Sequence, residues 1–388
     1  MRFPEFSGEW EKVLLGFISD IKTGPFGSTL HADDYVEEGT PIITTEHFKK
    51  GHLPTEKKGL PQVSDDDLKR LKQYSLEEND IVFSRVGSVD LNARVGKENE
   101  GWLFSGRVLR VKLKDFDSRY IHYVLSTQTV RNDIVSRAVG QTMPSINTGI
   151  LSNTSITIAP SIEEQNKLGR LFEILDARII AQSKIIEELT TLRSALLEKV
   201  FQVSNPTLEV GAIAHQTSER NKLGRYSNVL SVSNRFGFIN QSEQFEDRNV
   251  ASDDVRNYKV VHRGDFSYNP ARINVGSIAM LKNFESGIVS PMYICFQVDD
   301  TIVDPSFFEL FLETKAFKDE MEIRLEGSVR RCLSFEALCE IHLPRPALLV
   351  QRSISDKIGN ISSKIKLEDR ILRAYMRQKE WLLKQMFI

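Results

Sequence analysis

With 388 residues, the chain is long enough for about two domains of roughly 150 residues each. The hydrophobic fraction of 40% and the charged fraction of 27% are typical of a soluble globular protein. No apolar run approaches the roughly 18 residues of a membrane helix, and the start "MRFPEFSGEW" lacks the hydrophobic core of a signal peptide. Cys295, Cys332 and Cys339 share no CxxC spacing, and their odd number argues against a disulfide framework. We therefore expect a cytoplasmic protein with no membrane partner.

The net charge of −2 is distributed unevenly. Residues 1–84 carry 10 Lys and Arg against 16 Asp and Glu, whereas residues 85–160 carry 10 against 6. Residues 206–346 carry 16 against 20, and 11 of these 16 cations are Arg. A protein that coats DNA nonspecifically should be basic throughout. Any nucleic-acid binding by this chain must therefore use local patches.

The first 160 residues predict a domain of short strands followed by one short helix. The expected strands include "GTPIIT" (39–44), "DIVFSRVG" (80–87) and "GRVLRVKL" (106–113), each punctuated by Gly, Pro or Asn. The helix is expected near 117–137. The acidic run at 65–67 is interpreted as a solvated turn.

A helix of about 40 residues is predicted next, over 161–202. Ser161 can serve as its N-cap, with Glu164 completing a capping box. Two series of seven-residue spacing follow, and seven of their ten positions are apolar, which is typical of a coiled coil. The two series are Leu168, Leu175, Gln182, Leu189, Leu196 and Leu171, Arg178, Ile185, Leu192, Lys199.

A second domain of strands and a second long helix follow. The strands include "GDFSYNP" (264–270), "VGSIAML" (275–281) and "SPMYICFQV" (290–298), with a short helix near 304–325. The long helix is expected over 347–388. Its two series are Ile354, Ile361, Glu368, Tyr375, Leu382 and Ile358, Ile365, Leu372, Lys379, Met386.

The two halves repeat each other. Pro160 and Gln165 fall on Pro346 and Gln351 at a spacing of 186 residues, and "ALLEKVF" (195–201) answers "WLLKQMF" (381–387). The alternative is that both are core helices of one large domain. Forty helical residues span about 60 Å, however, which is too long for most core helices. We therefore expect an α+β protein in which two long helices pair as an antiparallel coiled coil.

The expected domain boundaries follow from this repeat. They are a first variable domain at 1–160, a first helix with its linker at 161–205, a second variable domain at 206–346 and a second helix at 347–388.

No catalytic motif is present. "YNPAR" (268–272) lacks the second proline and the aromatic residue of the amino-methyltransferase motif, and "GPFGS" (24–28) has neither P-loop lysine nor Rossmann spacing. The seven histidines form no HExxH motif and no cluster of metal-ligand spacing. The residues predict a binding protein without a metal site.

The opening "RFPEFSGEW", the run "GDFSYNPARINVGSI…SPMYICFQV" and the helix "P…EEQ…LGRLFEILDARI" resemble the specificity subunit of type I restriction–modification systems. The resemblance extends over essentially the whole chain. It implies two target-recognition domains that each read one half of a split sequence in double-stranded DNA. It also implies that two modification subunits dock on the central helices and that restriction subunits with motor activity join them. S-adenosylmethionine, ATP and Mg²⁺ would then bind to the partner subunits and not to this chain.

Base reading requires Arg, Lys, Asn or Gln side chains on a rigid scaffold. The candidates lie in loops that recur in both halves. They are Lys22, Ser28, Arg85, Arg94, Gln141 and Thr142 in the first domain, and Asn234, Arg235, Asn269, Arg272, Asn274, Ser328, Arg330 and Arg331 in the second. The expected helix interface comprises Leu168, Leu171, Leu175, Ile185, Leu189, Leu192 and Leu196 of the first helix and Ile354, Ile358, Ile361, Ile365, Leu372, Tyr375 and Leu382 of the second.

Two alternatives belong to other classes. A coiled-coil adaptor with protein-binding end domains would show no salt-dependent binding to duplex DNA. A self-sufficient DNA methyltransferase would bind S-adenosylmethionine on its own, but the chain lacks the motifs for it.

Overall fold

The computed structural model describes residues 1–25, 30, 34–202, 206–241, 254–327 and 331–387. The chain folds as two compact units: Met1–Ser183 with Arg370–Ile388 form unit 1, and Lys184–Asp369 form unit 2. The division therefore falls inside each of the two long helices, α6 (Ile162–Gln202) and α11 (Leu348–Met386). In the described parts of the chain, no helix has the length and apolarity to cross a membrane.

Unit 1 combines a four-stranded antiparallel sheet in the order β2-β9-β6-β7, a second sheet in the order β3-β5-β4-β8 and a two-stranded pair, β1-β10. The strands are β1 (Glu11–Leu14), β2 (Ser19–Thr23), β3 (Tyr35–Val36), β4 (Thr40–Ile43), β5 (Gln62–Val63), β6 (Ile81–Ser84), β7 (Asn92–Arg94), β8 (Leu103–Phe104), β9 (Val108–Leu113) and β10 (Ser155–Ile158). The helices are α1 (Leu15–Ile18), α2 (Asp65–Leu71), α3 (Ser118–Leu125), α4 (Gln128–Ser136) and α5 (Thr148–Ser152), with 3₁₀ turns η3 (Thr45–Phe48), η4 (Lys72–Tyr74) and η5 (Lys97–Asn99).

Unit 2 combines a four-stranded antiparallel sheet in the order β12-β19-β16-β17 with the pairs β13-β14, β15-β18 and β11-β20. The strands are β11 (Thr207–Glu209), β12 (Ala214–Thr217), β13 (Leu230–Ser233), β14 (Gly237–Asn240), β15 (Lys259–His262), β16 (Phe266–Tyr268), β17 (Ile278–Met280), β18 (Ser286–Val289), β19 (Ile294–Val298) and β20 (His342–Pro344). The helices are α8 (Pro305–Glu313), α9 (Lys315–Arg324) and α10 (Phe335–Cys339), with 3₁₀ turns η6 (Val210–Ala212) and η7 (Ile273–Val275).

The two units share one frame. In each unit, the first strand of the four-stranded sheet in chain order lies at one edge, next to the last strand, and the second and third strands complete the sheet. Three short helices follow this sheet in the chain, and the first and last strands of the unit pair with each other. Buried aspartates also recur: Asp80 accepts a hydrogen bond from the backbone N–H of Glu77, and Asp265 accepts one from that of His262. The segments inserted in the frame differ, since unit 1 carries β3, β4, β5 and β8 where unit 2 carries β13, β14, β15 and β18.

The short helix expected after each strand region is in fact a pair of helices. In unit 2 the break is at Thr314, which ends α8 and caps α9 by accepting a hydrogen bond from the N–H of Phe317 at 3.2 Å. In unit 1 the break is at Ser126 and Thr127. The Thr314 hydroxyl favours a new N-cap over a continuous helix, whereas the Thr127 hydroxyl donates to the carbonyl of Val124 at 2.7 Å and makes no cap hydrogen bond.

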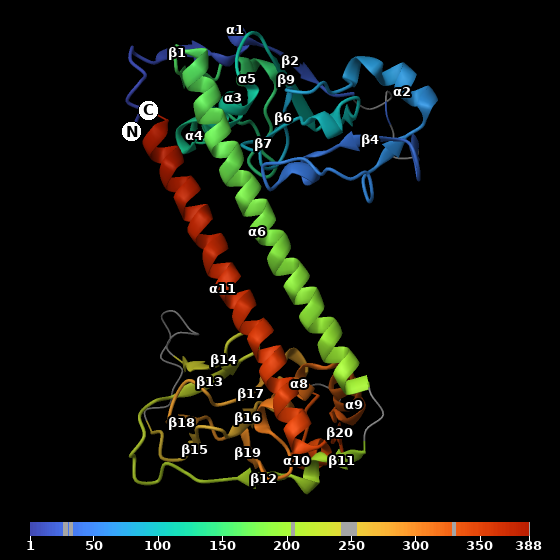
Figure 1. The fold of residues 1–388 in the computed structure, drawn as a ribbon, viewed down its shortest axis with the longest axis vertical. Coiled ribbons are helices and arrows are strands. Elements are labelled where there is room, and N and C mark those ends of the chain that lie inside the picture. The colour runs from blue at the N-terminus through green and yellow to red at the C-terminus, as the bar shows by residue number, and fades with distance from the viewer. Residues whose placement is uncertain (26–29, 31–33, 203–205, 242–253, 328–330, 388) are drawn as a thin grey trace. The chain divides into compact units, whose positions relative to one another are not determined.

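The long helices pair antiparallel within each unit, where Figure 1 shows their segments side by side. In unit 1, Phe172 packs against Phe387, and Asp176 bonds to Lys379. In unit 2, Arg193 donates a hydrogen bond to Ser362 at 2.7 Å. In these pairs, a lower residue number in α6 goes with a higher residue number in α11, so the two helices run antiparallel.

The series of α6 that begins at Leu168 faces inward as expected. The other inward-facing series begins one residue after the expected one. Leu168, Leu175 and Gln182 are buried and Leu189 and Leu196 are half-buried, whereas Ile185 is 41% exposed and Leu192 is 48% exposed. The second series of the stripe starts one residue later and comprises Phe172, Ile179, Ile186, Arg193 and Val200, all buried or half-buried. This series has four apolar members, against three in the expected one. Leu171 is half-buried beside it.

In α11 both expected series face inward. Ile358, Glu368 and Met386 are buried, and the other members are half-buried: Ile354, Ile361, Ile365, Leu372, Tyr375, Lys379 and Leu382. The start of α6 differs from a capping box. The N–H of Glu164 approaches the Ser161 hydroxyl at 3.4 Å, but the fully buried Glu164 carboxylate pairs with Arg2 at 2.6 Å.

Candidate nucleic-acid interface

Three loops of unit 2 converge on one cavity. They are the β13–β14 turn at 234–236, the β16–β17 loop at 269–277 and the turn at 290–293 before β19. Gly276 has φ +88° and lies so near Asn234 that a Cβ added to it would be 3.2 Å from the Asn234 Cβ. The Ser277 hydroxyl donates to the carbonyl of Val232 at 3.0 Å. These contacts fix the first two loops against each other.

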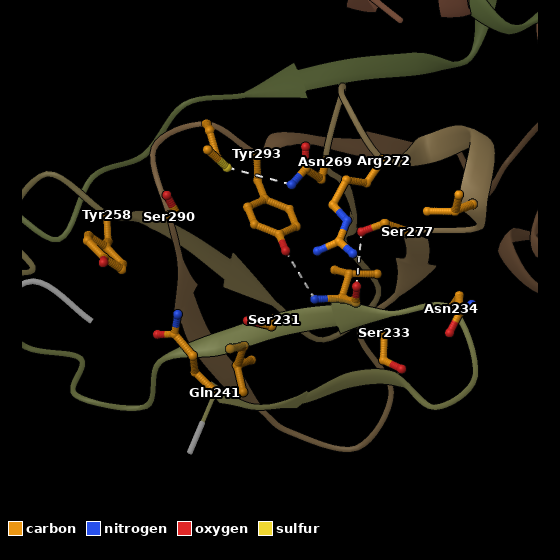
Figure 2. A pocket seen from close by; sticks show the side chains of 14 residues that line it. Ser231, Ser233, Asn234, Gln241, Tyr258, Asn269, Arg272, Ser277, Ser290 and Tyr293 are labelled. Atoms are coloured by element: carbon orange, nitrogen blue, oxygen red, sulfur yellow. Dashed lines mark hydrogen bonds between the residues drawn. The ribbon is translucent and has the colours of Figure 1, made fainter. Parts of the chain in front are cut away.

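The cavity between these loops has a volume of about 340 Å³, and Figure 2 shows the polar side chains around it. We name it the unit 2 pocket. Its lining residues are Leu230, Ser231, Val232, Ser233, Asn234, Gln241, Tyr258, Asn269, Arg272, Val275, Ser277, Ser290, Met292 and Tyr293. Three of the predicted DNA-binding residues, Asn234, Asn269 and Arg272, therefore share one site.

The electrostatics of the unit 2 pocket rest on Arg272. Among the described lining residues it is the one charged side chain, and none is acidic. Arg272 is exposed, and no ion pair joins it to a carboxylate in the described chain. Its guanidinium therefore keeps its hydrogen-bond donors for a ligand.

The pocket walls are held by hydrogen bonds. The Tyr293 hydroxyl accepts from the N–H of Val232 at 3.4 Å (Figure 2). The side-chain oxygen of Asn269 accepts from the N–H of Ala271 at 3.1 Å. Asn269 is 9% exposed, and its Nδ2 donates to the Sδ of Met292 at 3.6 Å, so both ends of its side-chain amide hold the pocket walls. Asn234, Arg235 and Asn274 are exposed at the loop tips, and the guanidinium of Arg235 lies 5.2 Å from the ring of Phe236.

Arg331 differs from Arg272. Its guanidinium donates to the side chain of Glu322 and, at 2.9 Å, to the backbone carbonyl of Glu322. It is exposed but occupied by an acidic neighbour, and it does not line the unit 2 pocket. Ser328 and Arg330, predicted in the same loop, lie outside the described residues, as does Ser28 of unit 1.

The predicted cations of unit 1 are engaged within the unit. Lys22 donates to the carbonyl of Gln73 at 3.1 Å, and Arg85 donates to the carbonyl of Gly106 at 3.0 Å. Arg94 forms an ion pair with Glu173 of α6 at 2.8 Å. These three side chains tie elements of unit 1 together.

Gln141 and Thr142 are accessible to a ligand. Both are exposed at the tip of a turn closed by the bridge between Val139 and Ser145. The N–H of Gly87 donates to the carbonyl of Pro144 at 2.8 Å and fixes this turn against the β6–β7 loop. In unit 2 the bridge between Glu326 and Cys332 closes the corresponding turn.

Several pocket residues were not predicted from the sequence. Ser290, Met292 and Tyr293 were expected inside a strand, but β19 begins at Ile294 and the preceding residues form a turn. Pro291 was the available signal, because proline rarely lies within a strand interior. Ser231 and Tyr258 carry no local signal, since they reach the cavity only through tertiary packing.

The described residues hold no group of three or more His, Cys, Asp or Glu side chains that could bind a metal ion. Burial raises the pKa of Cys295, so its thiol is not activated as a nucleophile. The arrangement in unit 2 is suited to binding a polar or anionic ligand.

Comparisons with known proteins agree with this picture. Residues 7–191 match the family model described as the type I restriction modification DNA specificity domain. The type I restriction enzyme MjaVIII specificity subunit of Methanocaldococcus jannaschii is 24% identical over 401 residues, covering 95% of this chain and 89% of that protein.

Two solved structures resemble the fold over its full extent. The S subunit of a type I restriction–modification system from M. genitalium has a TM-score of 0.66 at 16% identity, covering 100% of this chain and 99% of that one. A chain from a study of complex assembly and conformational transition in the type I system has a TM-score of 0.54 at 14% identity, covering 99% and 98%. Residues 7–191 are thus similar to the type I restriction modification DNA specificity domain, and nearly the whole chain is similar in sequence to one type I specificity subunit and in fold to the two solved structures.

Proposed function

We propose that this chain is the sequence-specific DNA-binding subunit of a type I restriction–modification complex. Each unit would read one half of a bipartite target in double-stranded DNA. The observation that carries the proposal is the shared frame with different insertions: the same sheet and helices present different loops in the two units. A duplicated scaffold with divergent loops suits a protein that reads two unlike half-sites.

The chain would contribute recognition and assembly, and its partners would contribute chemistry. Two modification subunits would bind along α6 and α11, and restriction subunits would join them in the cytoplasm. S-adenosylmethionine, ATP and Mg²⁺ would bind to those partners.

The test begins with cells that express this chain together with its modification subunit. Mapping the methylated bases should reveal one bipartite sequence with an unread gap. The purified complex should then bind a duplex of that sequence, and its affinity should fall linearly with salt on a logarithmic scale. A protein-binding adaptor would give neither a methylation pattern nor salt-dependent DNA binding. Methyl transfer by the purified chain alone would contradict a non-catalytic role.

A further inference from the structure

The unit 2 pocket is recessed as well as polar. Ser231, Asn269, Ser277 and Tyr293 line it, and each is at most 9% exposed. Its rim is exposed instead, with Val275 at 54% and Met292 at 61%. Reading a paired base requires side chains that project into a groove about 8.5 Å deep. The walls of this pocket are set back behind the rim, so a ligand must protrude to reach them.

The chemistry of the walls suits a nucleobase. Tyr293 and Met292 offer an aromatic ring and a polarisable thioether, and Leu230 and Val232 add apolar surface for stacking. Arg272 supplies donors, and the buried Oε1 of Gln241 is an acceptor without a hydrogen-bond partner in the described chain. Pockets that hold an extruded base combine these features, namely stacking surfaces with hydrogen bonds to the base edge.

We propose that unit 2 draws one base of its half-site out of the duplex and holds it in this pocket. The proposal rests on the DNA-binding function proposed above. The pocket reads the base and performs no chemistry on it, because its described lining includes no acid, no cysteine and no histidine. Specificity at that position then depends on the fit of the extruded base.

Unit 1 offers no equivalent pocket in the part of the chain that the structure describes. Its cavity of about 410 Å³ is lined by Glu78, Asn79, Arg94, Phe116, Asp117, Ser118 and Arg119. Two acidic side chains lie there, and Arg94 and Arg119 are already paired with Glu173. Base extrusion is therefore expected in only one half of the target.

Fluorescence and mismatched duplexes test the proposal with the full complex of this chain and its modification subunit. The probes are duplexes of the mapped target, each with one base pair of the unit 2 half-site replaced by a mismatch. Because a mismatched base costs less to extrude, one position should bind about tenfold tighter than the paired target. 2-Aminopurine at that position should brighten on binding, because it leaves the stack.

Two variants assign the effect to the pocket. Ser290→Tyr fills the cavity and should abolish both the tightening and the fluorescence change. Arg272→Gln should weaken binding of the matched target about tenfold and relax that one position. Arg263→Gln is the matched control, since Arg263 pairs with Glu285 and does not line the pocket, and it should leave both signals unchanged. Thermal melting should show that all three variants remain folded.

The outcomes separate the possible failures. If the complex binds its target but no mismatch in the unit 2 half-site tightens binding, the pocket does not hold a base and the proposed function stands. If Arg272→Gln weakens all sequences evenly and reduces the salt slope by about one, Arg272 meets a phosphate and the proposal is wrong. If the complex binds no specific duplex, the proposed function itself fails.

Discussion

The ammonium of Lys379 in α11 lies 2.5 Å from the carboxylate of Asp176 in α6. The same carboxylate accepts a hydrogen bond from the Tyr123 hydroxyl of α3 at 2.8 Å, and the ammonium lies 5.4 Å from the Tyr123 ring. A lysine that interrupts the apolar series of α11 thus has a charge partner in the facing helix. The contact joins both long helices to the short helices of unit 1.

Replacing Lys379 with alanine should destabilise unit 1 by about 1–3 kcal/mol, because the half-buried carboxylate of Asp176 loses its cation. Lys384→Ala is the control, since Lys384 pairs with Glu380 on the exposed face of the same helix. Surface pairs of this kind are worth about 0.3–0.5 kcal/mol. Urea unfolding of the three proteins measures the difference. Equal loss in both variants would contradict a structural role for the Lys379–Asp176 pair.

The stability of unit 1 should also depend on pH through Asp80. Burial raises the pKa of this carboxyl to about 6, although the N–H of Glu77 and the charge of Arg110 oppose the shift. Between pH 4 and 6 the folded chain therefore holds a proton that the unfolded chain has released, and stability contributed by this group is lost as pH rises.

Asp80→Asn removes this titration and keeps an acceptor for the Glu77 N–H. The free energy of unfolding of the variant minus that of wild type should be about 2–3 kcal/mol higher at pH 8 than at pH 4. Denaturant unfolding of both proteins across this range measures the gain. A difference that stays constant with pH would show that Asp80 does not titrate there.

Leucines of α6 provide a test of the buried stripe. Leu175 is 4% exposed and Leu192 is 48% exposed. Leu175→Asp should lower the melting temperature strongly, because burying an unpaired charge costs several kcal/mol. Leu192→Asp should change it little. Comparable losses in the isolated chain would place Leu192 in the stripe after all.

The sequence predicted the architecture because its evidence is periodic and long. The 186-residue repeat identifies the two helices, and the apolar series of α11 identify the inward face of that helix without tertiary information. The second series of α6 was assigned one residue too early, because Leu171, Ile185 and Leu192 fit the same seven-residue spacing as Phe172, Ile179 and Ile186. The helix break at Thr314 depends on a side-chain cap that periodicity does not report.

The candidate site was less predictable, because an exposed-looking cation gives no sign of its partner. Arg94 pairs with Glu173, 79 positions along the chain, and Lys22 bonds to Gln73, 51 positions along. The sequence identifies the residue type that can read a base but not which of these residues tertiary contacts have already occupied. Arg272 is distinguished only by the acid-free walls around it.

Substitutions of two glycines test whether the contact between Gly276 and Asn234 shapes the DNA-binding surface of unit 2. Gly276→Ala introduces a Cβ at positive φ and 3.2 Å from the Asn234 Cβ, so the β13–β14 turn must move. Gly264→Ala is the control, with φ +93° and no neighbouring atom within 4 Å. Both should cost about 1–2 kcal/mol of stability through backbone strain. Only Gly276→Ala should also weaken specific DNA binding, measured by titration, and equal affinities would show that the turn does not contact DNA.

Exchanging residues 206–346 for the matching segment of a related chain should change one half of the recognised sequence and leave the other half and the gap intact. The fold favours these boundaries, since β11 and β20 pair with each other and move together, and the N–H of Arg345 bonds to the carbonyl of Pro206 at 2.7 Å.

The new segment must still pack on the retained helices, where Phe201 stacks on Phe307 and contacts Phe311. A donor with aromatic or large apolar residues at these two positions is therefore the suitable choice. Methylation mapping in cells reports the outcome, and the reciprocal exchange of residues 1–160 should alter the opposite half. Because the two units share a frame but differ in their loops, a hybrid that altered both halves, or neither, would contradict the assignment of one half-site to each unit.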